Sequence, residues 1–518
     1  MKKCGALLLV FFILFVLIAP TACRTRSGNA FVIALGDNIR TIDPIGSPSV
    51  DAASERVRTL IFNTLVKKDE KFDYVGELAS DIKRSDDGLA YTFALRDGVK
   101  FHDGRVMTSA DVKYTLDLLF SSNFAKSASF FEGSGDQKRS YIKSVEAPDQ
   151  RTVIVTLTKP WVGLLSNLVP IPIIPKDSYD AQKTHPLGTG PFKFVNYDNT
   201  QQVCDVEAFP EYWDGPAKLQ QVRVRVIADM NALQAELQAG RVDIAPMPTS
   251  LSPDAVKRLE EDPNLRVQAF PGSNVVLLTL NTTSPPLDNV KVRQAIAYAV
   301  DRQSLIQNLL RGYGKIAHSI IPEESWAYSP GQTYAYDPAM AKRLLSEAGV
   351  RLDNPVVYKL SGSSIAGRQY AGVIQNYLKE VGIPVEIQTP EQNTLFDELR
   401  RGNFQIAYTQ WVGGNQDPIF YKDLFATSEI PTQTRPSRNR SRYSNPELDA
   451  MLEEAVNTFD RERARELYRK IQDIVSRDVP VFPLWYQSNI VIARKNVGNI
   501  QVNASGDWGF VKNLTKTD

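Results

Sequence analysis

The segment 91–114, YTFALRDGVKFHDGRVMTSADVKY, limits the fold more than any other stretch of the 518-residue chain. Its first five residues alternate large apolar side chains with small ones, which predicts a strand buried on one face. Two Asp-Gly pairs then predict tight turns on either side of a second short strand, Val99–Phe101. Thr108 or Ser109 can cap the helix that follows. All of these signals are structural, and none of them is catalytic.

The order of the expected elements predicts two mixed α/β lobes. Short strands with turn residues between them dominate up to about residue 285, beginning with Phe31–Leu35, and longer helices follow. Helices are expected over Val290–Arg311, Pro338–Ala348, Ile365–Val381, and Pro446–Val479 in two pieces. In the first of them an apolar stripe leaves Arg293, Asp301 and Arg302 largely on the solvated side. A final strand, Ser488–Ala493, is placed to return to the first sheet, so the chain is expected to cross between the lobes.

The amino end has the pattern of a secretory signal. Lys2 and Lys3 precede an apolar run over 6–19, and small residues lead to Cys23. The run is shorter than the stretch that a membrane-spanning helix usually needs. We therefore expect residues 1–23 to be a lipoprotein signal and Cys23 to carry the lipid, although Pro20 stands where such signals usually have an aliphatic residue. The alternative is an uncleaved anchor, and in both cases the body of the chain is exported and tethered near a membrane.

Composition indicates a folded protein, and the sequence shows no catalytic or metal-binding motif. Hydrophobic residues make up 43% and charged residues 23% of the chain, and the net charge of +1 gives no reason to expect a nucleic-acid partner. Cys204 is the only thiol beyond the expected signal, which excludes an internal disulfide or a multi-cysteine metal site there. The three histidines lie in separate turns, and neither a nucleophile elbow nor a phosphate-binding loop occurs. We expect no enzyme activity, no cofactor and no metal.

Several further blocks follow one another in the order of a known family. They are Thr41-Ile-Asp-Pro44, Pro186-Leu-Gly-Thr-Gly-Pro-Phe192, Tyr212-Trp213, Gln238-Ala-Gly-Arg-Val-Asp243, Leu280-Asn281, Pro285-Pro286, Val292-Arg-Gln-Ala-Ile296, Trp411 to Pro418 and Tyr443-Ser-Asn-Pro-Glu-Leu-Asp449. With the segment 91–114, they resemble the family 5 extracytoplasmic solute-binding proteins, which serve peptide and nickel ABC importers. One block alone is weak, because Gly, Pro, Asn and Asp gather in any turn.

The resemblance implies an α/β, two-lobed periplasmic-binding-protein fold of type II, in the large cluster C form. It places lobe I at 31–75, 180–280 and 488–518, an extra subdomain of lobe I at 76–179, and lobe II at 281–487. A ligand cleft lies between the lobes, which close over the solute by a hinge movement. The implied partners are a peptide or other small solute, an ABC permease and its separate ATPase subunits. A monomer held by its lipid anchor outside the cytoplasm is expected.

The chain departs from the peptide-binding pattern of the family at both ends of the ligand. Those relatives hold the peptide's amino group with an acid three positions after the tryptophan, where this chain has Gly414. Dipeptide-specific relatives hold the carboxylate with an arginine at a position near Ser361. Asp417 is close enough in sequence to replace the missing acid, or else it caps the turn before Ile419.

The candidate ligand-binding residues come from both lobes. Asp37 and Asn38 follow the first strand, where relatives expose backbone to the ligand. Trp411 either stacks on the ligand or belongs to the core, and its block adds Gly413, Gly414, Asn415 and Asp417. Ser361 and Arg440 complete the set, and Arg440 lies in an arginine-rich loop that is either solvated or turned toward an anionic ligand.

Two functions remain open on the sequence alone. The first is a substrate-binding lipoprotein that delivers a peptide or similar solute to an ABC importer. The second is a solute sensor or periplasmic chaperone on the same scaffold. Within transport, nickel chelates, glycosides and opines compete with peptides as ligands.

Overall fold

The computed structural model describes residues 30–47, 51–132, 138–411, 417–433, 435 and 437–517. The expected signal with Cys23, and the loop residues Gly413, Gly414 and Asn415, lie outside these ranges. Within them, no helix combines the length and the apolar character needed to traverse a bilayer.

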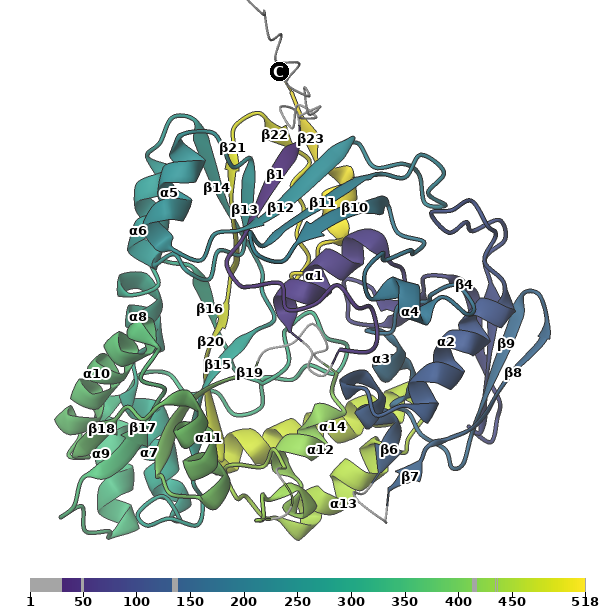
Figure 1. Ribbon diagram of the computed structural model, residues 1–518. Helices are drawn as coiled ribbons and strands as arrows, with labels where there is room; N and C mark the ends of the chain where they lie inside the picture. Colours follow the sequence, from purple (N-terminus) through teal and green to yellow (C-terminus); the bar gives the residue numbers. More distant parts are fainter. Residues whose placement is uncertain are drawn as a thin grey trace, which may run out of the picture.

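A seven-stranded sheet is the framework of the first lobe and lies at the top of Figure 1. The expected strand Phe31–Leu35 is β1, and it pairs in parallel with β12 and β13. In spatial order the strands are β10 (Phe192–Asp198), β11 (Val203–Ala208), β12 (Gln221–Val226), β1, β13 (Ile244–Pro246), β21 (Asn489–Arg494) and β14 (Leu265–Phe270). The chain's late strand thus returns to the first sheet, as predicted.

A six-stranded sheet forms the second lobe, at the lower left of Figure 1. Its strands, in spatial order, are β16 (Gly314–Ile316), β20 (Val481–Gln487), β15 (Val275–Leu280), β19 (Ile406–Trp411), β17 (Val356–Lys359) and β18 (Val385–Gln388). Every residue of β15 is buried, as expected for the central part of a sheet covered on both faces.

Two short segments connect the lobes. Residues 271–274 lead from β14 in the first sheet to β15 in the second, and residue 488 leads from β20 back to β21. The amide of Ser273 donates to Ala504 O (3.0 Å) and that of Gln487 donates to Asn274 O (2.9 Å), which ties the two crossings to their surroundings. Because β15 pairs entirely within the second sheet, we propose to place the lobe boundary at 271–274, earlier than the expected 280.

A four-stranded antiparallel sheet lies within the predicted extra subdomain, on the right of Figure 1. Its order is β4 (Ala79–Arg84), β5 (Ala90–Leu95), β9 (Thr152–Leu157) and β8 (Ile142–Asp149). Thr108 caps α2 (Ser109–Ser121) in a capping box with Asp111. The expected short strand at 99–101 is only a single bridge, Lys100 to Val106.

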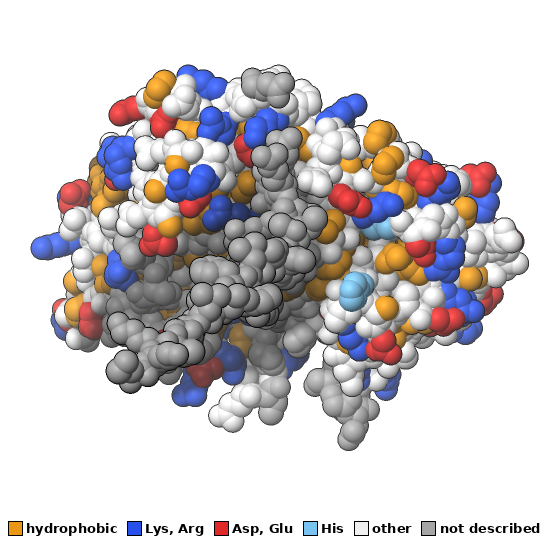
Figure 2. Space-filling model, turned by 45° about the horizontal axis from the view of Figure 1, so that its top comes forward, with side chains coloured by type: hydrophobic (Ala, Val, Ile, Leu, Met, Phe, Trp, Pro, Cys, Tyr) orange, Lys and Arg blue, Asp and Glu red, His pale blue; other side chains and the backbone are white. Residues whose placement is uncertain are grey.

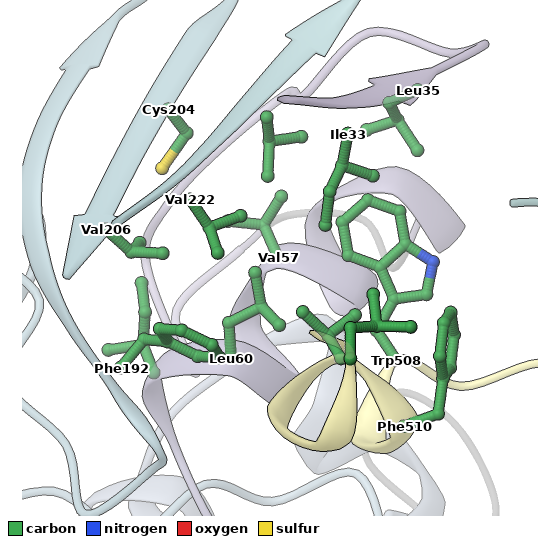
Figure 3. Close-up of a cluster of buried hydrophobic side chains, with 14 of the residues drawn as sticks. Ile33, Leu35, Val57, Leu60, Phe192, Cys204, Val206, Val222, Trp508 and Phe510 are labelled. Atoms are coloured by element: carbon green, nitrogen blue, oxygen red, sulfur yellow. The ribbon is translucent and has the colours of Figure 1, made fainter. Parts of the chain in front are cut away.

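The first lobe has a continuous apolar core beneath its sheet. Figure 3 shows side chains of β1, β11 and β12 pointing toward Val57 and Leu60 of α1 (Ala52–Ile61), with Trp508 and Phe510 beside them in the same cluster. Cys204 is fully buried in this cluster. The chain's carboxyl-terminal segment thus completes the core that its first strand begins.

The remaining helices and small strand pairs surround the three sheets. The helices are α3 (Leu164–Leu168), α4 (Tyr179–Gln182), α5 (Met230–Gln238), α6 (Pro253–Glu260), α7 (Val290–Ala299), α8 (Arg302–Asn308), α9 (Pro338–Ala348), α10 (Ile365–Glu380), α11 (Gln392–Arg401), α12 (Phe420–Phe425), α13 (Pro446–Ala455) and α14 (Arg461–Asp478). The strand pairs are β2 (Val66–Lys68) with β3 (Tyr74–Gly76), β6 (Phe131–Glu132) with β7 (Arg139–Ser140), and β22 (Val497–Gly498) with β23 (Thr515–Lys516).

The predicted helix over 290–311 is two helices, and its two arginines are not solvated. Asp301 caps the second helix by accepting from the amide of Ser304. Arg302 is only 5% exposed and donates to the carbonyls of Ala317, Pro483 and Tyr334. Arg293 is equally buried and donates to the carbonyls of Leu287 and Asp478. The apolar stripe did not indicate the burial of these arginines, because segments distant in sequence cover the polar side of the helices.

Candidate ligand site between the lobes

The carboxyl ends of three parallel strands form the edge of the first sheet that faces the crossings. Leu35 ends β1 opposite Val226, and Pro246 at the end of β13 pairs with Val491 of β21. Strand β21 begins just after the crossing residue, so these strand ends lie beside it. Ligands of open α/β sheets commonly bind at such carboxyl ends.

The predicted residues Asp37 and Asn38 lie at this edge, directly after β1. Both are exposed, and Asp37 Oδ2 accepts weakly from Thr249 Oγ1, 3.5 Å away. Gly36 keeps the two loops close, because a Cβ there would lie 2.9 Å from the same hydroxyl oxygen. The loops after β1 and β13 therefore meet at one place.

Trp411 lies at the matching edge of the second sheet. It ends β19 and pairs with Val275, the first residue of β15 after the crossing. Its ring is 5.6 Å from that of Phe420 and 5.6 Å from the guanidinium carbon of Arg438. The ring thus has an aromatic neighbour and a cationic neighbour, and it is only partly buried.

The two lobes are in direct contact through the β2–β3 hairpin. The hydroxyl of Tyr74 donates to Asp417 Oδ2 of the second lobe. Beside it, Asp73 forms an ion pair with Arg461 at the start of α14. The guanidinium of Arg84 lies 4.1 Å from the centre of the Phe459 ring, which adds a third contact between the lobes.

Asp417 caps the turn before Ile419, as one of its two predicted roles required, and it also contacts the first lobe. Its Oδ1 accepts from the amide of Ile419 at 2.8 Å, while Oδ2 accepts from Tyr74. Burial raises the pKa of Asp417, and the charge of Lys68 acts in the opposite direction. Burial lowers the pKa of Lys68 to about 8, although Asp417 favours its charged form. Contact of Asp417 with a ligand stays a prediction.

Ser361 and Arg440 lie elsewhere in the second lobe. Ser361 follows β17, which runs parallel to β19, and its hydroxyl lies 2.8 Å from that of Ser363. The guanidinium of Arg440 covers Phe396 of α11, with its carbon 5.1 Å from the ring centre. Burial lowers the pKa of Arg440, and the charges of two neighbouring arginines act in the same direction. No described contact brings Arg440 to Asp37 or Trp411, so its ligand role also stays a prediction.

No group of three or more His, Cys, Asp or Glu side chains in the described part of the chain is arranged to hold a metal ion. Acidic and basic side chains are interspersed on the face shown in Figure 2. On the described part of this face, neither sign of charge forms a continuous patch.

The sequence does not indicate the residues that join the lobes. It also does not single out Arg56 of α1, a cation near the edge of the first sheet. Tyr74 and Arg461 are separated from their partners by several hundred positions, so no local motif indicates them. Arg56 lies on an amphipathic helix among other charged residues, where a solvated position is the ordinary expectation. Only the fold brings these side chains together.

Comparisons with known proteins identify the family. Residues 73–432 match the bacterial extracellular solute-binding proteins, family 5. This chain belongs to that family. It is 30% identical over 499 residues to heme-binding protein A of Haemophilus influenzae, covering 90% of this chain and 88% of that protein. It is 31% identical over 481 residues to the glutathione-binding protein GsiB of Pectobacterium atrosepticum, covering 89% of each.

Solved structures confirm the predicted two-lobed fold of this family 5 protein. The ABC transporter substrate-binding protein CtaP of Listeria monocytogenes matches with a TM-score of 0.83 at 25% identity, over 95% of this chain and 100% of that one. The oligopeptide-binding protein AppA of Bacillus subtilis, in complex with a nonapeptide, matches with a TM-score of 0.71 at 25% identity, over 95% and 99% of the chains.

Proposed function

We propose that this family 5 protein captures a peptide or similar small polar solute outside the cytoplasm and delivers it to an ABC permease. The observation that carries the proposal is the arrangement of two lobes connected by short crossings, with residues of both lobes meeting at the β2–β3 hairpin. A solute that binds both lobes favours the closed arrangement by its extra affinity for that state. No bond is made or broken, so the protein acts as a binding component and not as an enzyme.

The peptide-like nature of the solute is supported by the named relatives. They include heme-, glutathione- and dipeptide-binding proteins, and the solved relatives include complexes with peptides. The ligand classes thus vary within the family while the scaffold stays the same. Peptide-like solutes are the largest group among these names, and we propose that class here.

Membrane attachment belongs to the same proposal. Cys23 follows an apolar run and two small residues, as in lipoprotein signals. Lipidation there would hold a monomeric protein at the membrane that contains the permease and its ATPases. Metabolic labelling with a fatty-acid analogue tests this, because wild type should be labelled and Cys23→Ser should not.

Native mass spectrometry of the protein released gently from the cell envelope tests the binding function. We expect a non-covalent adduct of small mass that disappears on partial unfolding and fragments as a peptide or a peptide-like compound. A single adduct without amide bonds would support transport of another solute class. Failure to bind any small molecule, including a peptide library added at high concentration, would contradict the proposal.

A further inference from the structure

Arg56 is a partly buried cation at the ligand-facing edge of the first lobe. It lies on α1, contacts Met247 in the loop after β13, and is close enough to Asp37 in the loop after β1 to be influenced by its charge. Its Nη2 lies 3.9 Å from Met247 Sδ, and that sulfur is its only hydrogen-bond acceptor among the described residues. A thioether is a weak acceptor. In the described chain, no carboxylate forms an ion pair with Arg56.

Two buried cations near Arg56 each have a carboxylate and a carbonyl oxygen as partners. Arg58 lies two residues further along the same helix and contacts Glu55 at 2.5 Å and the Asp43 carbonyl at 2.6 Å. Lys126 contacts Glu55 at 3.1 Å and donates to two carbonyl oxygens. Because an unpaired buried charge is costly, proteins normally supply such partners. Arg56 differs from these neighbours by lacking them.

The surroundings of Arg56 are held in place by the fold. Met247 has a left-handed backbone, with φ of +50°, and its amide donates to Ile490 O at 2.6 Å, beside the crossing. Non-glycine residues in this conformation are concentrated at ligand-binding and active sites. Burial lowers the pKa of Arg56, and the charge of nearby Asp37 opposes that effect. Arg56 and Asp37 are thus close enough to interact electrostatically but are not paired in an ion pair.

We propose that Arg56 binds a carboxylate of the solute, and that Asp37 accepts hydrogen bonds from an adjacent N–H or ammonium group of the same solute. A guanidinium offers two parallel N–H donors that match a carboxylate. The neighbouring Asp37 disfavours a doubly charged group such as phosphate, since like charges would then lie close together. This inference rests on the proposed function and specifies which solutes the cleft accepts.

Arg56 and Asp37 would also compensate for charged groups that the second lobe lacks in its sequence. Gly414 and Ser361 stand where peptide-binding relatives carry the charged groups that hold the two ends of a peptide. A carboxylate anchored on the first lobe by Arg56 needs neither of them. The solute would then bind first to the first lobe and contact the second lobe on closure.

Titration calorimetry with acid and amide forms of the same probes tests the inference. The probes are trialanine and trialanine amide, glutathione and its diethyl ester, and inorganic phosphate, each added to refolded, solute-free protein. We expect wild type to bind the free acids more tightly than the amide or ester. Arg56→Gln should weaken binding of the acids about tenfold or more and leave binding of the amide or ester unchanged. Arg56→Lys should have an intermediate effect, and Arg351→Gln, an exposed arginine of the second lobe, should have none.

The outcomes separate the inference from the proposed function. The role of Arg56 would be overturned if Arg56→Gln lost affinity equally for acid and amide. It would also be overturned if the variant lost no affinity and kept the thermal midpoint of wild type. Neither result would contradict solute capture. Tighter binding of phosphate than of any carboxylate would also overturn the role of Arg56. If wild type binds none of the probes, the peptide-like solute class is wrong and the inference falls with it.

Discussion

His102 is held in its neutral form by two backbone groups of the 188–190 turn. Its Nε2 lies 3.0 Å from Gly190 O, and its Nδ1 accepts from the amide of Gly188 at 3.3 Å. A protonated ring would lose the second of these bonds. Burial lowers the pKa of His102 to about 4, which is consistent with this geometry.

The neutral state of His102 predicts a pH dependence of stability. Below pH 6.5 the unfolded chain takes up a proton that the folded protein accepts only near pH 4. The free energy of unfolding should therefore fall between pH 6.5 and 4, by about 3 kcal/mol at most from this residue. Urea unfolding of wild type and His102→Gln across this range measures it, and the variant should lose less stability. Parallel pH profiles would show that His102 does not contribute.

Arg302 connects three parts of the second lobe through the carbonyls it contacts. Removing the guanidinium leaves the Ala317, Pro483 and Tyr334 oxygens without this donor. We expect Arg302→Met to lower the free energy of unfolding by roughly 3 kcal/mol or more. Arg343→Met on the exposed side of α9 is the matched control and should change it by less than about 0.5 kcal/mol. Equal effects of the two substitutions would contradict the account.

At the scale of residues, the sequence predicts local partners far better than distant ones. The Thr108 cap follows from neighbouring residues. The burial of Arg302 does not, because its partners come from three distant segments. The unpaired state of Arg56 is visible only once the loops after β1 and β13 are in place.

Among the elements, the β2–β3 hairpin and the start of α14 provide a contact between the two lobes. Asp73 pairs with Arg461, whose guanidinium also stacks 3.6 Å from the ring centre of Trp326. The stacking holds the arginine in the position needed to reach the first lobe. Tyr74 and Asp417 add a second contact beside it.

Loss of Arg461 should therefore favour the open arrangement. We expect Arg461→Ala to increase the radius of gyration of the solute-free protein in small-angle scattering and to weaken solute binding severalfold. Arg469→Ala lies on the same helix and pairs only with Asp473 among the described residues, so it should leave both quantities unchanged. Identical behaviour of the two variants would show that this hairpin contact does not influence closure.

Element positions were predicted well where one periodic pattern covered the whole element. The strand Phe31–Leu35 and the helix Pro338–Ala348 were predicted with the bounds observed. The helix expected over 290–311 failed, because Asp301 begins a second helix by capping it. Periodicity continues across such a break, so the pattern alone does not reveal it.

On the scale of the whole molecule, two crossings connect the lobes. The lobes also touch at the β2–β3 hairpin and between α6 and the segment after α8, where Arg311 pairs with Asp254. The family resemblance predicted the two lobes, and the pairing of β15 within the second sheet supports the proposed boundary at 271–274. Of the predicted site, Asp37 and Trp411 lie at the facing edges of the two sheets. Gly413, Gly414 and Asn415 lie outside the described residues, and their ligand roles stay predictions.

The distance between the lobes in solution tests solute capture most directly. Spin labels at Thr200→Cys and Lys342→Cys, both exposed and on different lobes, report that distance by pulsed electron paramagnetic resonance. The native thiol Cys204 should not interfere, since burial raises its pKa to about 12. We expect a broad, long distance distribution without solute and a shorter, narrower one when the co-purified solute is restored. An unchanged distribution in the presence of a bound solute would contradict capture by closure.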